Sequence, residues 1–350
     1  MTSPNIHLTN MSTITIRKSY IESFGDPSHV SIITTELPSP AADEVQLKVL
    51  YSGFGGSDIA MRLGGYPNQK PAPLTTGYSC IGHITQNGTG NPKFPVGTLV
   101  GCLCVYEGQS TYINLPEKYL IPIPSGVDLQ QAVALILDWT TAYGMVYRSG
   151  KVAKGQRVFV HGLSGSVGYA LLTLCKREGA DVYGTASEYN HAAVRAAGAH
   201  PFVYTNKDWM KSMNAIGGAH VVFDPLGFKS YDESWDILAR GGGKLIGYGG
   251  NYNVLNGGKP RSQWPQIAKL LAKNLNVFCP NSTAFFYVDR DKSTFAPELK
   301  TLLEMLRKGE IKVPIRKLWT LDEVPEAHRM FNKGPGIGAV VIKVADDDDF

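Results

Sequence analysis

Short stretches of alternating apolar and polar residues dominate the N-terminal part of the chain. Residues 45–51 alternate with a period of two, and residues 96–105 and 109–113 have a similar strand-like pattern. Proline and glycine separate these stretches at short intervals, as they do in turns between antiparallel strands. The pattern predicts an antiparallel, β-rich module at this end of the chain.

The pattern changes at residue 128, after which helical and strand-like stretches alternate. A helical stretch over 128–149 comes first, and repeated β-α units follow it. Units of this length predict a parallel, doubly wound sheet of the α/β class. Strands are expected at 157–161, 181–185, 202–204, 220–224, 244–247 and 276–279, and helices at 167–178, 190–197 and 229–238.

The last part of the chain loses the β-α repeat. The helices and strands expected here lie at 297–308, 313–319, 324–331 and 339–344. Since these strands have no parallel sheet of their own, we expect the chain to return and complete the first module. The predicted domains are therefore a discontinuous one, residues 1–127 and 281–350, and a central one, residues 128–280.

Length and composition narrow the classes of protein that fit. A chain of 350 residues predicts about two domains, at the usual ~150 residues each. With 43% hydrophobic and 18% charged residues it is too apolar for a disordered chain, and it lacks the run of ~18 apolar residues that a membrane-spanning helix needs. The net charge of +4 is scattered, so no nucleic-acid partner is expected. The acidic residues Asp346–Asp349 are expected to form a solvated, unstructured end.

The cysteines and the N-terminus indicate a reducing compartment. The five cysteines form no C-x-x-C pair and no disulfide-scaffold spacing, so free thiols are expected. The N-terminal residues lack the apolar core of a signal peptide. These features predict a soluble, cytoplasmic protein without a membrane partner.

A glycine-rich turn between a strand and a helix is the strongest local signal. Gly162, Gly165 and Gly168 directly follow a buried strand and precede or open the predicted helix. Glycines placed in this way let backbone amides approach a pyrophosphate, and the helix N-terminus adds partial positive charge. The spacing is G-x-x-G-x-x-G rather than G-x-G-x-x-G, so a merely tight strand-to-helix turn is the alternative to dinucleotide binding.

The end of the second strand of this unit favours NADP over NAD. A site for NAD would place an acidic residue there to bind the ribose 2′-hydroxyl, and none occurs before Glu188. The segment instead carries Thr185 and Ser187, whose hydroxyls can donate to a 2′-phosphate. The alternative is that these are simply small loop residues.

Six segments of the chain match, in register, the pattern of one enzyme family: Ser57–Pro67, Thr140–Tyr143, His161–Gly168, Phe223–Gly227, Gly241–Gly249 and Leu321–His328. Over nearly its whole length the chain resembles a medium-chain dehydrogenase/reductase of the zinc-independent quinone oxidoreductase and enoyl reductase branch. The resemblance implies a GroES-like, β-rich substrate domain formed from both chain ends and wrapped around a Rossmann domain. It also implies a homodimer paired through the edge of the Rossmann sheet, for which the apolar residues 276–279 are the candidate.

The departures from the family pattern imply that the chain binds no metal. Zinc-dependent members have a cysteine where this chain has Gly55, and a G-H-E segment where it has Gly77, Tyr78 and Ser79. Without a Lewis acid, an activated C=C bond is easier to reduce than an isolated ketone. We therefore expect an NADPH-dependent reductase of a small α,β-unsaturated carbonyl compound. The alternatives are a quinone or carbonyl oxidoreductase and a non-catalytic dinucleotide-binding protein.

Two catalytic candidates follow from the resemblance. Tyr66 matches a tyrosine that enoyl reductases of this branch use as a donor or acid, and Ser57 matches a hydroxyl that some members use for proton relay. A packing tyrosine and a turn-capping serine are the alternatives. The branch often has asparagine in place of Gly55, in contact with the nicotinamide, and this departure weakens the quinone-reductase interpretation.

The resemblance assigns the cofactor contacts to residues of the Rossmann domain. They are Thr141, Ser164, Gly165, Ser166, Val167, Gly168, Ser187, Asn190, Tyr204, Gly247 and Tyr248. Thr141 is expected near the nicotinamide, the residues 164–168 around the pyrophosphate, and Ser187 and Tyr204 around the adenosine phosphate. The branch frequently has lysine in place of Asn190 and Ala339, so both departures imply weaker binding of the phosphate of NADPH.

Overall fold

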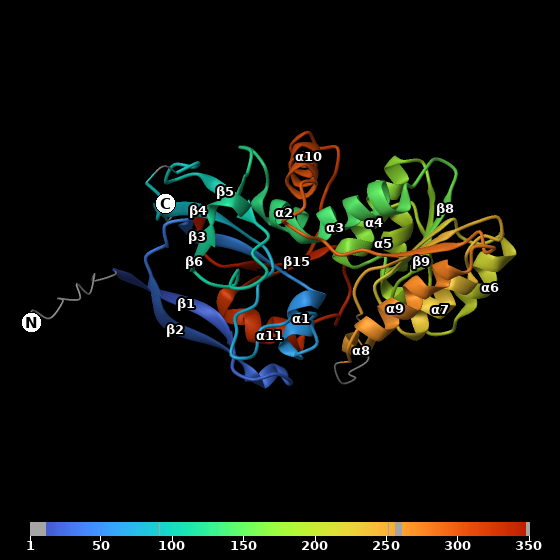
Figure 1. Cartoon of the computed structure of the whole chain (residues 1–350), viewed down its shortest axis with the longest axis horizontal. Helices are drawn as coiled ribbons and strands as arrows, with labels where there is room; N and C mark the ends of the chain where they lie inside the picture. The colour runs from blue at the N-terminus through green and yellow to red at the C-terminus, as the bar shows by residue number, and fades with distance from the viewer. Residues whose placement is uncertain (1–11, 91, 251, 256–260, 348–350) are drawn as a thin grey trace, which may run out of the picture.

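Two β-sheets and the helices around them organise the chain into two lobes that lie side by side (Figure 1). The structure is a computed structural model that describes residues 12–90, 92–250, 252–255 and 261–347. The first lobe, on the left in Figure 1, holds a seven-stranded sheet and a separate two-stranded hairpin, and the second lobe holds a six-stranded sheet.

The seven-stranded sheet combines segments from both ends of the chain. Its strands are β3 (Glu44–Phe54), β4 (Cys80–Asn87), β5 (Leu99–Cys102), β6 (Tyr112–Pro116), β7 (Ile121–Pro122), β14 (Ile315–Thr320) and β15 (Ala339–Lys343), and the hairpin beside it is β1 (Thr13–Ile21) and β2 (Val30–Pro38). The order is β14-β15-β3-β4-β5-β7, and β6 also pairs with β3. β15 pairs antiparallel with β3, which is buried along most of its length. The C-terminal strand therefore supplies the partner that this buried strand needs at one edge.

All neighbouring strands of the six-stranded sheet run parallel. The strands are β8 (Arg157–His161), β9 (Asp181–Thr185), β10 (His200–Phe202), β11 (Val221–Asp224), β12 (Lys244–Gly247) and β13 (Ser282–Phe285). Their order, β10-β9-β8-β11-β12-β13, reverses between β8 and β11, as in doubly wound nucleotide-binding sheets. The α/β class with a separate β-rich lobe, here the first lobe, is thereby confirmed.

The helices of the second lobe connect these strands and cover the two faces of the sheet (Figure 1). They are α4 (Ser166–Arg177), α5 (His191–Ala196), α6 (Asp208–Ala215), α7 (Lys229–Asp236), α8 (Tyr252–Leu255) and α9 (Trp264–Ala272). Because both faces of the sheet are covered, its central strands β8 and β11 are almost entirely buried.

The prediction of a final strand at 276–279 is wrong. The sixth strand is β13, which pairs with β12 and lies beyond residue 280, where the sequence analysis ended the central domain. Residues 276–279 form a turn in which the Asn276 side chain accepts from the backbone N–H of Phe278, and Pro280 follows. Phe278 is 94% exposed. An asparagine that bonds its own backbone competes with a sheet ladder, and the apolar pattern alone did not reveal this.

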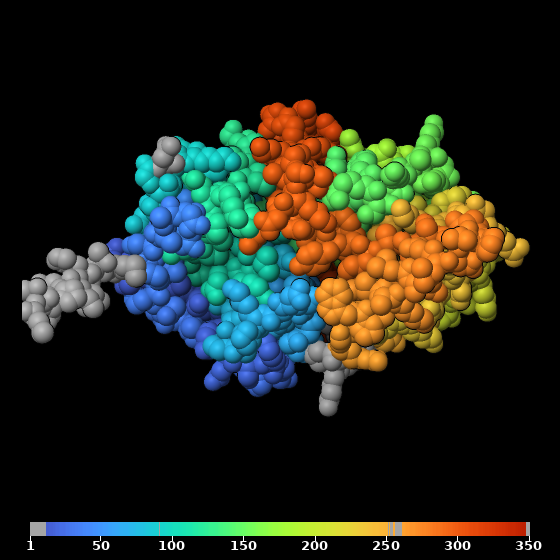
Figure 2. Space-filling view, viewed as in Figure 1, coloured from blue at the N-terminus to red at the C-terminus, as the bar shows by residue number. Residues whose placement is uncertain are grey.

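A helical segment over residues 129–150 joins the lobes. It consists of α2 (Leu129–Ala134) and α3 (Thr140–Tyr143), with a π-helical stretch after each. α10 (Phe295–Arg307) packs against it, and the chain that leads to α10 crosses between the lobes in orange (Figure 2). One continuous apolar core includes residues of both lobes, such as Ile81 and Val158. This shared core holds the two walls of the site described below in place.

The prediction of an unstructured acidic end is wrong for Asp346 and Asp347. Asp346 forms an ion pair with Lys343, and the Asp347 carboxylate lies 3.0 Å from Nε2 of His83 on β4. Asp348 and Asp349 lie outside the described residues. Within the described parts of the chain, every helix is too short or too polar to span a lipid bilayer.

Candidate active site

A cleft of about 670 Å³ lies between the two lobes. The first lobe contributes the start of α1 (Gly56–Arg62) and the loop after it, and the second contributes residues at the ends of β12 and β13 and the start of α9. The predicted residues that line this cleft are Ser57, Tyr66, Thr141, Val167 and Tyr248. The structure thus brings both catalytic candidates together with part of the predicted cofactor site, in a volume typical of small-molecule sites.

Asp58, which the sequence analysis did not single out, fixes the edge of the cleft at α1. Its buried carboxylate accepts hydrogen bonds from the backbone N–H groups of Gly55 (2.8 Å) and Gly77 (2.9 Å) and from Nε2 of Gln109 (3.3 Å). Burial raises the pKa of Asp58 to about 6, against the lowering effect of these backbone donors. The bonds hold the turn that places Ser57 on the cleft wall, so Asp58 is a positioning residue.

Tyr66 belongs to a cluster of three phenol groups, here called the tyrosine cluster: Tyr66, Tyr78 and Tyr287. The Tyr66 hydroxyl donates to the Tyr78 hydroxyl at 2.8 Å, and the Tyr287 hydroxyl lies 3.2 Å from that of Tyr78 and 3.5 Å from that of Tyr66. Tyr66 and Tyr287 line the cleft, whereas Tyr78 is 2% exposed behind them. Burial raises the pKa of Tyr66 and of Tyr78 far above its ordinary value, so both stay protonated donors at neutral pH.

Sequence reasoning found one member of this cluster and missed the roles of the other two. Tyr78 was noticed only as a replacement for a zinc ligand, and that position was the one signal that could have marked it. Tyr287 follows β13 and is more than two hundred residues from Tyr66 in the chain. No local motif marks it, because its place depends on how the second lobe docks against the first.

Asp138 is a further cleft residue that the sequence analysis did not find. Burial raises its pKa to about 6, and the nearby Ser166 hydroxyl acts in the opposite direction. It lies three residues before Thr141, whose hydroxyl donates to the Leu137 carbonyl at 2.6 Å. Besides the neutral phenols, the cleft therefore contains a carboxyl group whose pKa of about 6 is close to neutral pH.

The loop of residues 162–168, here called the nucleotide loop, has glycines with two different explanations. Gly162 has a φ of +78°, and a Cβ on Gly168 would lie 2.0 Å from the Gly162 carbonyl oxygen, so the fold itself requires both. A Cβ on Gly165 would meet only the Gly162 oxygen at an ordinary 3.5 Å. Ser166, the first residue of α4, has a buried hydroxyl that interacts with the Asp138 carboxyl. Gly165 and Ser166 therefore fit a ligand that approaches the helix N-terminus closely.

The neighbouring lobe holds this loop in position. The Ser164 carbonyl accepts from the backbone N–H of Gly338 at 3.0 Å. Asn190, predicted to contact the cofactor, is buried, and its Oδ1 accepts from the backbone N–H of Gly336 at 2.9 Å. The amide thus anchors the segment before β15, a role that the sequence did not reveal.

Ser187 and Tyr204 lie at one edge of the sheet, where the cofactor phosphate is expected. Thr185 and Phe202 are paired residues at the ends of the parallel strands β9 and β10. Ser187 and Tyr204 each come two residues after this pair, so they emerge at the same carboxyl edge. Tyr204 is 55% exposed, which leaves its ring open to a ligand.

Gly247 and Tyr248 lie at the carboxyl end of β12. A Cβ on Gly247 would lie 2.5 Å from the Tyr231 hydroxyl, so this glycine allows α7 to pack on β12. The next residue, Tyr248, lines the cleft, and burial raises the pKa of its phenol far above the ordinary value. Of these two predicted cofactor residues, only Tyr248 is placed on the cleft wall.

The described residues contain no group of three or more His, Cys, Asp or Glu side chains that could hold a metal ion. Gly55 and Ser79, which stand where zinc-dependent members of the family are expected to have ligands, have no imidazole, thiolate or carboxylate in their side chains. The expectation of a zinc-free site stays a prediction, and a measurement that tests it is given below.

Two family models match this chain. The model of the alcohol dehydrogenase GroES-like domain matches residues 41–125, and that of a zinc-binding dehydrogenase matches residues 197–342. Among curated proteins, the rat synaptic vesicle membrane protein VAT-1 homolog is 28% identical over 319 residues, which are 87% of this chain and 78% of the rat protein.

Solved structures with the same fold have lower sequence identity. The Escherichia coli quinone oxidoreductase complexed with NADPH superposes with a TM-score of 0.82 at 19% identity, over 94% of this chain and all of the other. The JamJ enoyl reductase in its apo form superposes with a TM-score of 0.81 at 22% identity, over 94% of this chain and 99% of the other. At this identity the likeness shows the fold alone.

Proposed function

We propose, from the premise that this chain belongs to the medium-chain dehydrogenase/reductase superfamily, that it is an NADPH-dependent reductase of an activated C=C bond. The substrate would be a small α,β-unsaturated carbonyl compound, bound in the cleft between the lobes. The tyrosine cluster carries the proposal, since it offers neutral hydrogen-bond donors in a buried cleft at the position where zinc-dependent relatives bind their metal.

The nucleotide loop supports a dinucleotide cofactor. Gly165 leaves room for a close approach to the N-terminus of α4, and the Ser166 hydroxyl there can donate to a pyrophosphate oxygen. Ser187 and Tyr204 would hold the adenosine end, and the absence of an acidic side chain before Glu188 favours NADPH over NADH. When bound, the cofactor would supply the hydride that adds to the β-carbon of the substrate.

The tyrosine cluster would stabilise the charge that this addition creates. Negative charge develops on the carbonyl oxygen of the resulting enolate, and Tyr66 can turn its proton from Tyr78 toward that oxygen. Tyr78 can then donate to Tyr66, and Tyr287 to Tyr78, so each bond polarises the next. A proton delivered through these hydroxyls to the α-carbon completes the reduction, and solvent restores it through the half-exposed Tyr287.

Reduction of a quinone is the second candidate. The same donors can stabilise the oxyanion of a reduced quinone, and a Cβ at Gly55 would meet nothing within 4 Å, so this part of the wall leaves room for a ring. The fold shared with the quinone oxidoreductase is equally compatible with this candidate. A non-catalytic dinucleotide-binding protein is the third.

Turnover against a panel of substrates separates the three candidates. Oxidation of NADPH is followed by its absorbance, with enones, enoyl thioesters, quinones and simple aldehydes as the substrates. We expect enones or enoyl thioesters to give the highest kcat/KM. Preference for quinones would favour the second candidate, and binding of NADPH without any turnover would favour the third.

A homodimer and a cytoplasmic location complete the proposal. Leu275, Val277 and Phe278 are 81%, 82% and 94% exposed, and they follow α9 next to the edge strand β13. A second copy that covers this apolar surface would form a dimer at the sheet edge. Sedimentation velocity at micromolar concentration tests the dimer, and cell fractionation tests the location, since the VAT-1 relatives are named as vesicle membrane proteins.

A further inference from the structure

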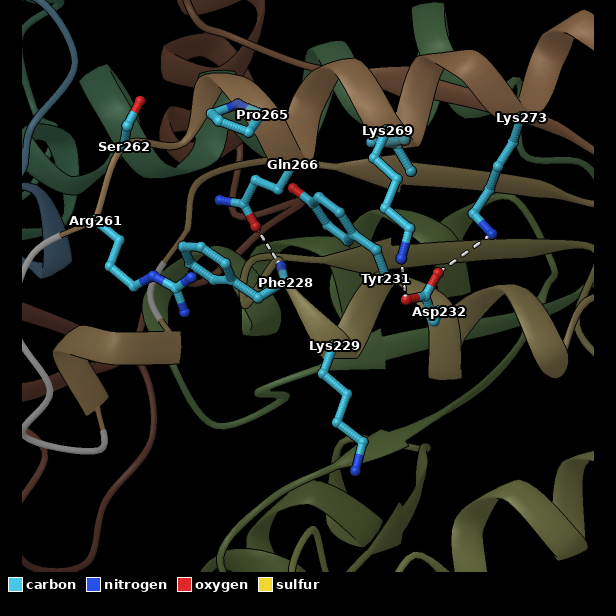
Figure 3. Close-up of a pocket in the computed structure, with 11 residues that line it drawn as sticks. Phe228, Lys229, Tyr231, Asp232, Arg261, Ser262, Pro265, Gln266, Lys269 and Lys273 are labelled. Atoms are coloured by element: carbon cyan, nitrogen blue, oxygen red, sulfur yellow. Dashed lines mark hydrogen bonds and ion pairs between the residues drawn. The ribbon is translucent and has the colours of Figure 1, made fainter.

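A second, basic groove of about 540 Å³ lies between α7 and α9 (Figure 3). The residues that line it are Phe228, Lys229, Tyr231, Asp232, Arg261, Ser262, Pro265, Gln266, Lys269, Leu270 and Lys273. Four of these side chains are cationic and one is acidic. The nucleotide loop lies on a different part of the sheet, so nothing in the proposed cofactor site accounts for this groove.

The cations of the groove are only partly neutralised. Lys269 and Lys273 lie 2.6 Å and 3.3 Å from the oxygens of Asp232, so one carboxylate serves two ammonium groups. Lys229 lies 3.8 Å from the carboxylate of Glu233. The Arg261 guanidinium lies 5.3 Å from the centre of the Phe228 ring and forms no ion pair within the described residues. A surface with this excess of positive charge attracts anions.

Gln266 adds a buried donor that has no partner. Its side-chain oxygen accepts from the backbone N–H of Phe228, which settles which end of the amide is the nitrogen. Gln266 is 8% exposed, and its Nε2 is buried without a hydrogen bond among the described residues. In Figure 3 this nitrogen points toward the space between Arg261 and Ser262. Because a buried N–H group normally has a partner, the arrangement indicates a missing acceptor.

The groove is continuous with the cleft. Arg261 and Ser262 line both cavities, and α9 separates them, with Ile267 on the cleft side and Gln266 on the groove side. A substrate whose reacting end lies beside the tyrosine cluster could therefore extend past Ser262 and place its other end in the groove.

We propose that this groove is a phosphate-binding subsite, and that it holds the phosphate on the distal end of the substrate. The inference rests on the proposed reductase function and makes its substrate an enoyl thioester with a phosphorylated arm. Arg261 pairs with the phosphate charge, and Gln266 donates to one of its oxygens.

Two substrates that differ only in the phosphate test this proposal. Crotonyl-phosphopantetheine and crotonyl-pantetheine are compared as substrates of the full chain with NADPH. We expect a KM about tenfold or more lower for the phosphorylated thioester, as one charge-assisted contact can supply. The variant Arg261→Gln removes this difference, whereas Lys211→Gln, which removes an exposed charge on α6, keeps it. Inorganic phosphate should raise the KM of the phosphorylated thioester alone.

Other outcomes overturn the proposal. Equal KM values for the two thioesters would exclude a phosphate subsite and leave the reductase function standing. Inorganic phosphate that changes kcat without competing would make the groove a site for free phosphate instead. If neither thioester is reduced, the reductase proposal fails, and calorimetry with phosphopantetheine and pantetheine then decides. A preference for phosphopantetheine that is lost in Arg261→Gln supports the groove, and equal binding of the two compounds overturns it.

Discussion

The nucleotide loop and the tyrosine cluster border the same cleft, and they are built in opposite ways. The loop uses backbone and small residues that are contiguous in the chain, and its shape follows from Gly162 and Gly168. The cluster uses three large side chains that lie at residues 66, 78 and 287. A local sequence motif can therefore predict a binding site that is formed by the backbone. A site that is formed by distant side chains exists only after the lobes have docked. The predictions below separate these two kinds of construction.

The largest effect is expected in the nucleotide loop. Gly168→Ala would force a Cβ to within 2.0 Å of the Gly162 oxygen, so the turn must shift. We expect the affinity for NADPH to fall about 100-fold or more and the free energy of unfolding to fall by about 3 kcal/mol. Fluorescence titration of NADPH and denaturant unfolding measure the two quantities.

Gly165→Ala is the matched control in the same loop. Its Cβ would meet nothing closer than 3.5 Å, so the free energy of unfolding should stay within about 0.5 kcal/mol of the wild type. Affinity for NADPH should still fall, since the added methyl group occupies the space left for the ligand. Unchanged NADPH binding by both variants would remove the loop from the cofactor site.

In the tyrosine cluster, Tyr66→Phe removes the donor and keeps the ring. We expect kcat to fall about 100-fold, with a smaller change in KM, because the hydrogen bond strengthens as the oxyanion forms. Tyr287→Phe should cost less, about tenfold, since it acts through Tyr78. NADPH affinity should be unchanged in both variants. Turnover close to that of the wild type in Tyr66→Phe would exclude the phenol from the mechanism.

The two buried carboxyls of the cleft predict a dependence on pH. The pKa of Asp138 is raised from 3.8 to about 6, so its contribution to stability is fully present below about pH 4 and is lost as the pH rises through 6. Asp138→Asn removes the charge, so its free energy of unfolding relative to wild type should rise by about 1–3 kcal/mol between these pH values. Denaturant unfolding at pH 4 and pH 7.5 measures this difference.

Asp58→Asn is the contrasting variant. Asp58 has the same raised pKa of about 6, but its two oxygens accept three N–H groups. An asparagine would turn an NH₂ group toward one of those donors, so this variant should be less stable than wild type at both pH values. A stabilised Asp58→Asn at pH 7.5 would contradict the positioning role.

Cofactor choice should change with one residue at the edge of the sheet. Ser187→Asp places a negative charge where the 2′-phosphate is expected, so the affinity for NADPH should fall about tenfold while that for NADH is retained. Titration of both cofactors by nicotinamide fluorescence measures the ratio. Wild-type protein that binds NADH as tightly as NADPH would contradict the proposed preference.

No effect is expected from removal of metal ions. Gly55, Tyr78 and Ser79 supply no good zinc ligands, so activity should be unchanged after treatment with a chelator, and elemental analysis should find no stoichiometric zinc. One zinc ion per chain, lost together with activity, would overturn the zinc-free assignment.

Much of the architecture could be predicted because it is encoded in local patterns. The strands from β8 to β12 and the helices α4, α5 and α7 follow from apolar runs separated by turn residues, and the parallel sheet follows from their order. Helix α6 was not predicted. The prediction of a strand at 276–279 failed for a reason that hydrophobic periodicity does not contain, the hydrogen bond from the Phe278 backbone N–H to the Asn276 side chain. Tyr66, Ser57 and Thr141 could be placed near one another because each lies in a recognisable segment.

The sequence by itself determined that the chain has two folding units and a glycine-rich loop. It also determined which glycines that loop requires. Only the tertiary structure decided that Tyr78 and Tyr287 join Tyr66, that the Asn190 amide holds Gly336, and that a basic groove continues the cleft past Ser262. The physical reason is the distance along the chain over which each feature is decided. Backbone conformation responds to neighbours a few residues away, whereas a hydrogen bond between side chains far apart in the chain depends on how the whole core brings their elements together.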